Sequence, residues 1–140
     1  MAFSPFQKIT LGIAGISALA IGLCILAIPH RFYAGYGITL PHDASLLSEL
    51  RAPGAGLAVL GGLMLWGMVN SAMRRVAQVA ALTVYIGFPA GRLIGLLADG
   101  VPSGGILGAL AFEIGIAVLC LLAFRRGLWT SVPQGAVQTT

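Results

Sequence analysis

The sequence is poor in charged residues. Lys, Arg, Asp and Glu make up 9% of its 140 residues, against roughly 25% in soluble domains. Hydrophobic residues make up 58%, so too little polar material is present to cover a water-soluble globule. This composition excludes a soluble domain, a disordered chain and a nucleic-acid-binding domain, and it predicts an integral membrane protein surrounded by lipid.

Cysteine is also scarce. Cys24 and Cys120 are the two cysteines of the chain, which excludes a disulfide-stapled secreted module. Their predicted depths in the membrane differ by roughly 20 Å at about 1.5 Å per residue, so they cannot pair with each other. We expect both to be small, buried, hydrophobic side chains.

Motifs of known chemistry are missing as well. The sequence contains no Walker loop, GxGxxG, GxSxG or CxxCH motif. His30, His42, Asp43 and Glu49 match no established metal-ligand spacing, so we predict no metal site. An enzyme using Glu113 or Glu49 as a general base is therefore the least favoured class of function.

The hydrophobic residues fall into four runs long enough to cross a membrane. The predicted spans cover residues 9–28, 51–69, 76–98 and 104–124, with a polar tail over residues 127–140. Asp43 is expected to cap the helix of the second span, and Asp99 and Gly100 to end the third. The first run is longer than a signal-peptide core and lacks a cleavage site, so we expect the chain to keep it. The predicted fold is all-α, a single-domain, integral membrane four-helix bundle over residues 1–140.

Two features modify these helices. Pro53 and Pro89 lie inside the second and third spans and predict kinks there, because each removes a backbone hydrogen-bond donor. Each proline also frees the carbonyl four residues earlier, and we expect Arg51 and Arg92 to donate to these carbonyls.

Between the first two spans, aromatic residues over 32–36 predict an interfacial exit followed by a loop.

The charges predict the orientation. The bases expected at the side that holds both termini are Lys8, Arg74, Arg75, Arg125 and Arg126. The two loops of the other side hold Arg31, with Arg51 at the border. Because Lys and Arg accumulate in cytoplasmic segments, both termini are predicted to face the cytoplasm.

Small residues recur at intervals of four, the spacing that lets membrane helices pack closely. The predicted helix-packing rows are Thr83, Gly87, Gly91 and Gly95 in the third span, Gly54, Ala58 and Gly62 in the second, and Gly104 and Gly108 in the fourth. Two uses are open for these rows, packing inside the monomer or forming the face of a homodimer. Packing inside the monomer is favoured, because a four-helix protein needs such rows internally.

The deepest charges predict a polar centre in the outer half of the membrane. Arg92 lies about 9–10 Å from the end of the third span and Glu113 about 15 Å from the start of the fourth, at about 1.5 Å per residue. Each unpaired charge there costs at least about 2.5–3.5 kcal/mol, so we expect these two residues to pair. The predicted cluster consists of Glu49, Arg51, Tyr85, Arg92, Asp99 and Glu113. It serves either to bind an anionic headgroup, a carboxylate or a quinone carbonyl, or to lock the helices by ion pairs.

Three segments resemble a known family: SELRAPGAGLAVLGGLMLWG, FPAGRLIGLLADGVPSGG and FEIG. The most specific residues are Gly91, Arg92, Asp99, Gly100, Pro102 and Ser103, accompanied by Glu49, Arg51 and Glu113. Over roughly residues 9–124 the chain resembles the bacterial family named domain of unknown function 4345. The resemblance implies a small four-helix protein of the bacterial inner membrane and assigns no activity. The architecture is more loosely similar to the DoxX-like proteins, some of which attach to quinone-linked oxidoreductases.

Two functions are carried forward from the sequence. The favoured one is a non-enzymatic accessory subunit that packs against a larger membrane protein complex or a second copy of itself. The alternative is a binder or carrier of a lipid, an isoprenoid or a quinone, whose polar end meets Arg92 and Glu113. No cofactor is expected beyond such a bound lipid or quinone, and no nucleic-acid partner is expected.

Overall fold

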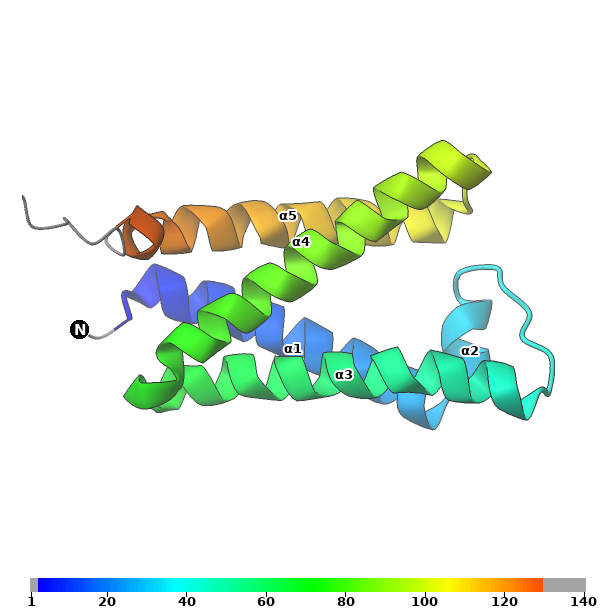
Figure 1. Cartoon of the computed structure of the whole chain (residues 1–140), viewed down its shortest axis with the longest axis horizontal. Helices are drawn as coiled ribbons and strands as arrows, with labels where there is room; N and C mark the ends of the chain where they lie inside the picture. Colours follow the sequence, from blue (N-terminus) through cyan, green and yellow to red (C-terminus); the bar gives the residue numbers. More distant parts are fainter. Residues whose placement is uncertain (1–2, 130–140) are drawn as a thin grey trace, which may run out of the picture.

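The computed structural model describes residues 3–129, and this part of the chain is helical without strands (Figure 1). The elements are α1 (Pro5–Ala27), α2 (Pro29–Ala34), α3 (Ala44–Val69), the short 3₁₀ turn η1 (Ser71–Met73), α4 (Arg74–Asp99) and α5 (Gly104–Trp129). α1, α3, α4 and α5 are long and apolar enough to cross a membrane. The predicted all-α fold with four membrane-spanning helices is thereby confirmed.

Capping residues fix where the helices begin and end. Ser4 and Gln7 form a capping box that starts α1 four residues before the predicted first span. The side chain of Asp43 accepts a backbone hydrogen bond of 2.7 Å at the start of α3, as predicted. α4 ends at Asp99, and Gly100 follows with a φ of 96°, a conformation that favours glycine.

Two stretches differ from the predicted boundaries. Residues 29–34, expected to lead into a loop, form the short helix α2, which Pro29 starts because its fixed φ suits a first helical position. α5 continues to Trp129, past the predicted end at Phe124. Charged residues mark the membrane interface without ending a helix, and arginine is a good helix former. Residues 127–129 of the predicted tail therefore belong to α5, and residues 130–140 lie outside the described residues.

α1 and α3 pack closely through glycine. A Cβ atom at Gly22 would lie 2.5 Å from the backbone nitrogen of Ala58 and 2.6 Å from the carbonyl oxygen of Gly54. A Cβ atom at Gly61 would meet the backbone of α1 at Leu19 and would lie 2.8 Å from the carbonyl oxygen of Gly15. The row on α3 that contacts α1 therefore runs through residues 54, 58 and 61. Gly62, predicted for this row, does not contact α1, since a Cβ atom there would have no heavy atom of another element within 4 Å. The reason is helical periodicity, because steps of four and three residues follow one face at 3.6 residues per turn.

Both prolines inside the spans leave their helices continuous. Arg51 donates from Nε to the carbonyl of Leu26 at 3.1 Å, and Arg92 donates to Glu113. The expectation that these arginines serve the carbonyls freed by the prolines is therefore wrong. Leu26 lies in the last turn of α1, where carbonyls lack a helical partner and accept such a donor.

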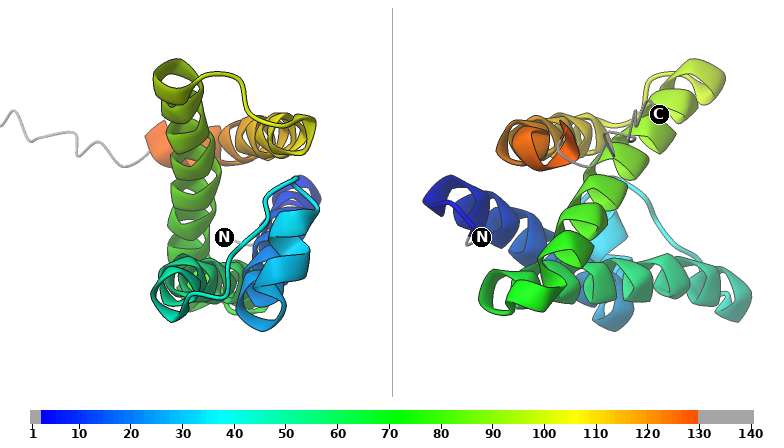
Figure 2. Two further views of the ribbon diagram at one scale, coloured as in Figure 1. Left: turned by 90° about the vertical axis from the view of Figure 1, so that its right-hand side faces the viewer. Right: turned by 60° about the vertical axis from the view of Figure 1, so that its left-hand side comes forward.

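The four long helices pack tightly at one end of the molecule and separate toward the other (Figures 1 and 2). The core combines the first halves of α1 and α4 with the second halves of α3 and α5, and its most buried large side chains are Leu11, Met64, Cys120 and Phe124. At this end Gln7 of α1 donates to the carbonyl of Ala123 in α5 at 2.8 Å. Cys24 and Cys120 are both free thiols, as predicted.

Candidate functional site

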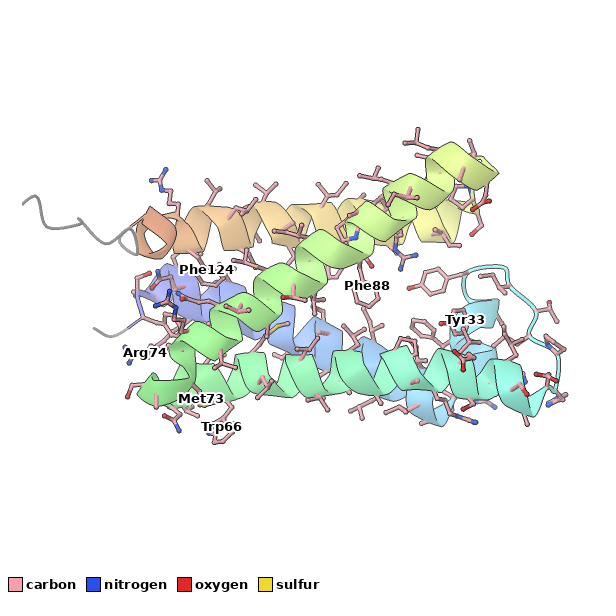
Figure 3. The ribbon with its side chains drawn as sticks, viewed as in Figure 1. Tyr33, Trp66, Met73, Arg74, Phe88 and Phe124 are labelled. Atoms are coloured by element: carbon pink, nitrogen blue, oxygen red, sulfur yellow. The ribbon has the colours of Figure 1, made fainter. Side chains whose placement is uncertain are left out.

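A cleft of about 890 Å³ occupies the end where the helices separate. Figure 2 (left) looks toward this end, with α4 and α5 on two sides and α1, α2 and α3 on the others. Its lining includes Ile21 and Ile25 of α1, Leu57 of α3, Phe88 of α4 and Phe112 of α5. Phe88 and Tyr33 project into the space from opposite sides (Figure 3). The cleft is therefore formed by all four long helices and by α2, and most of its wall is apolar.

Arg92 and Glu113 form an ion pair on this wall. The Arg92 Nε lies 2.9 Å from Oε2 of Glu113, and Nη2 lies 3.1 Å from Oε1. Such a two-point contact matches the planar guanidinium to the carboxylate and is among the stronger polar contacts in proteins. The side chain of Arg92 is 30% exposed and that of Glu113 only 11%, so the guanidinium is the more accessible partner.

Tyr85 lies near the pair but bonds elsewhere. Its side chain is buried, and its hydroxyl donates to the carbonyl of Ala14 at 2.8 Å and lies 2.6 Å from Oγ of Ser17. These contacts join the first half of α4 to α1 at the inner limit of the cleft. Tyr85 therefore lines the cleft while acting as a link between two helices.

The other members of the predicted cluster do not join the pair. Glu49, Arg51 and Asp99 are exposed and lie outside the lining of the cleft. Arg51 is engaged at the end of α1. Asp99 lies two turns beyond Arg92, at the end of α4, where this helix has diverged from α3. The separation of the helices thus keeps these charges apart, although they share the same half of the molecule.

Aromatic residues missing from the predicted cluster line the cleft instead. Phe32, Tyr33 and Tyr36 contribute to its wall, and the ring of Phe32 contacts the two tyrosine rings edge to face at 5.3 and 5.2 Å between centroids. From the sequence, these rings are predicted to be anchors at the membrane interface. They line the cleft only because α2 folds back toward the long helices. Burial raises the pKa of the Tyr33 hydroxyl, and the charge of Arg92 acts in the opposite direction.

The glycine rows of α4 and α5 do not pack against a neighbouring helix. A Cβ atom at Gly87, Gly91 or Gly108 would have no heavy atom within 4 Å, and all three residues line the cleft. Gly95 and Gly104 lie outside the lining. A Cβ atom at Gly104 would meet nothing within 4 Å, and one at Gly95 would meet only Oδ2 of Asp99, in the same helix, at 3.9 Å. The favoured prediction that these rows pack inside the monomer is therefore wrong for both helices. The cause is that α4 crosses the bundle, so its second half diverges from α3 (Figure 1). Thr83, at the start of the row, is also exposed.

Two histidines lie together in the connection before α3. The rings of His30 and His42 have centroids 4.5 Å apart, and Nε2 of His30 is buried without a hydrogen-bond partner among residues 3–129. Within the described residues, no group of three or more His, Cys, Asp and Glu side chains is placed to hold a metal ion.

Comparison with known proteins identifies a family without a known activity. No curated protein and no solved structure matches the chain. The model of a family described as domain of unknown function (DUF4345) matches residues 6–124, which include α3, α4, nearly all of α1, α5 as far as Phe124 and the whole lining of the cleft. The chain therefore belongs to the DUF4345 family of small helical proteins, with four helices suited to a membrane.

Proposed function

We propose that this protein binds a membrane amphiphile, such as a lipid, an isoprenoid or a quinone, in the cleft at its open end. The observation that carries the proposal is a largely apolar cleft of about 890 Å³ with one ion pair, Arg92 and Glu113, on its wall. Small-molecule sites are typically clefts of about 300–1,000 Å³ with a few polar groups in an apolar lining. An amphiphile has the matching distribution of polar and apolar parts.

The glycines support the same proposal. Gly87 and Gly91 of α4 and Gly108 of α5 all line the cleft, and each leaves space where a side chain would stand. Glycine costs helix stability by roughly 1 kcal/mol relative to alanine, so a row of open glycines needs a compensating use. Room for a ligand is such a use.

The orientation remains part of the proposal. Phe3 lies against the guanidinium of Arg74, 5.3 Å from ring centroid to Cζ, so the N-terminal segment and the turn before α4 share one end of the molecule. This end carries Lys8, Arg74, Arg75 and Arg125, and we assign it to the cytoplasmic side of a bacterial inner membrane. The cleft then opens in the outer half of the bilayer.

Copurification tests the proposal. The full chain is purified in a mild detergent, and native mass spectrometry identifies the small molecules that remain bound. We expect one retained amphiphile in the wild type and its loss in Gly91→Leu, which fills the cleft. Gly95→Leu is the matched control, because Gly95 lies one turn away on the same helix and outside the lining. Equal retention by the wild type and Gly91→Leu would refute binding in the cleft.

A second candidate function is that of an accessory subunit, which packs against a larger membrane protein or a second copy. The observation that favours it is the open backbone at Gly62, Gly95 and Gly104, all outside the cleft. Membrane helices associate where small residues allow close approach. Here Gly95→Leu is expected to abolish copurification of the partner protein, or to convert an oligomer to a monomer in light scattering. A monomer that retains no protein partner would contradict this function.

A further inference from the structure

The chemistry of the cleft wall restricts the polar end of its ligand. Arg92 and Glu113 are the two charged residues of the lining, and their formal charges cancel. Both oxygens of the Glu113 carboxylate accept hydrogen bonds from the same guanidinium. The other charged residues of this half of the molecule lie outside the lining. A ligand therefore meets a site without net charge.

Hydrogen-bond donors remain available on this wall of the cleft. A guanidinium carries five N–H donors, and the ion pair uses two of those of Arg92, so three remain. Tyr33 also lines the cleft, and its hydroxyl makes no hydrogen bond with the residues that the structure describes. A tyrosine hydroxyl is protonated at neutral pH, and burial raises the pKa of Tyr33 further, so this hydroxyl can donate. These donors suit an acceptor atom on the ligand.

A charged head would disturb the pair. An anionic head would bring a second negative charge beside Glu113 and compete with it for Arg92, and a cationic head would do the same to Arg92. Removing one partner of a low-dielectric ion pair leaves an uncompensated charge, which is costly. An uncharged acceptor can take the remaining N–H groups and leave the pair intact.

We propose, on the basis of the amphiphile-binding function above, that the cleft selects amphiphiles with an uncharged, hydrogen-bond-accepting head, such as a carbonyl or hydroxyl oxygen. The head lies between Arg92 and Tyr33, and the apolar part lies along the wall formed by Phe88 and Phe112. Glu113 acts as a specificity-determining residue, because it neutralises the arginine that would otherwise attract an anion.

Three probes with the same chain and different heads test this selectivity: farnesol, farnesyl phosphate and farnesylamine. Tritiated farnesol is bound to the full chain in phosphatidylcholine nanodiscs and displaced by each unlabelled probe. Specific binding in the cleft is defined as the probe binding that Gly91→Leu loses and Gly95→Leu keeps. We expect farnesol to compete at least tenfold better than either charged probe.

Replacing the carboxylate reverses the preference. Glu113→Gln keeps the size of the side chain and leaves Arg92 without its counter-charge. Direct binding of tritiated farnesyl phosphate is expected to rise at least tenfold in this variant, and farnesol is expected to lose its advantage. Arg92→Gln, which removes the positive charge, is expected to gain no affinity for the phosphate.

The outcomes separate the two proposals. Stronger binding of farnesyl phosphate or farnesylamine than of farnesol to the wild type, again lost in Gly91→Leu, would overturn the selectivity and leave amphiphile binding in place. The wild-type comparison decides this point even where Glu113→Gln fails to fold. If none of the three probes shows binding that Gly91→Leu removes, the proposed selectivity is overturned too. The copurification experiment then tests the proposed amphiphile-binding function on its own.

Discussion

Arg92 of α4 and Glu113 of α5 meet in a two-point ion pair, with 2.9 Å between Nε and Oε2, at the level where the two helices border the cleft. The pair joins two helices that have diverged from α1 and α3 at this end (Figure 1). The ion pair links two helices and also supplies the polar part of the proposed binding site. Variants are therefore needed that affect these two roles separately.

Breaking the pair from one side is expected to destabilise the protein more than removing both charges. Arg92→Leu leaves the Glu113 carboxylate, only 11% exposed, without its counter-charge, and Glu113→Leu leaves the guanidinium unpaired. We expect each single variant to lose about 2.5 kcal/mol, the lower end of the cost of a lone charge in a membrane, because Arg92 is 30% exposed. The double variant should recover part of this loss. The free energies of unfolding of the wild type, the two single variants and the double variant, measured in SDS mixed micelles, form a double-mutant cycle. Purely additive losses in this cycle would contradict coupling between the two residues.

Gly61 and Gly62 make a matched pair for testing the α1–α3 interface. Gly61 faces the backbone of α1 at Leu19, whereas nothing lies within 4 Å of a Cβ at Gly62. Gly61→Leu is expected to destabilise by about 3 kcal/mol or more through overpacking against a rigid backbone. Gly62→Leu should leave the free energy of unfolding unchanged or raise it slightly, because leucine favours helices. A lower thermal midpoint of unfolding for Gly62→Leu than for Gly61→Leu would refute the register in which α1 and α3 pack.

The Tyr85 hydroxyl is expected to stabilise the contact between α4 and α1. Tyr85→Phe removes the hydrogen bond of 2.8 Å to the buried carbonyl of Ala14 and should cost about 1 kcal/mol in the free energy of unfolding. Tyr33→Phe is the control, since the Tyr33 hydroxyl makes no hydrogen bond with the residues that the structure describes, and its loss should leave stability unchanged. Equal stabilities of the two variants would show that the Tyr85 link contributes nothing.

The sequence predicted the helices well because their signals are local. Runs of apolar residues set the four spans, and Asp43 caps α3 through its own side chain. The depths of Arg92 and Glu113 also follow from counting residues along their helices, and the cost of a lone charge in lipid then points to a partner. The structure places these two side chains in contact.

The parts that the sequence missed depend on how the helices are placed in space. Spacing by four does not say which face of α3 meets α1, and so it selected Gly62 where Gly61 makes the contact. Glycines at a close helix interface and glycines around a cleft look alike in a sequence, which is why Gly87 and Gly91 were assigned to packing. Tyr33 lines the cleft only because of the place that α2 takes beside the long helices, and no local pattern encodes that placement.

The orientation of the protein gives the last prediction. In a Cys24→Ser, Cys120→Ser background, single cysteines are placed by Ala44→Cys before the second span and by Ser71→Cys in η1, both at exposed positions. If the basic end faces the cytoplasm, a membrane-impermeant maleimide should label the cysteine at 44 in intact spheroplasts and the cysteine at 71 only after permeabilisation.

The same assay tests whether Arg74 and Arg75 determine that orientation. These arginines are the first two residues of α4, directly after η1, so they are close enough to the predicted span for the positive-inside effect to act on them. Replacing both by glutamine should allow part of the population to insert the other way, so that the cysteine at 71 becomes labelled in intact spheroplasts. Labelling at 71 but not at 44 without these replacements would place both termini outside the cytoplasm. The cleft would then open toward the inner leaflet, and its ligand would have to reach it from the cytoplasmic side.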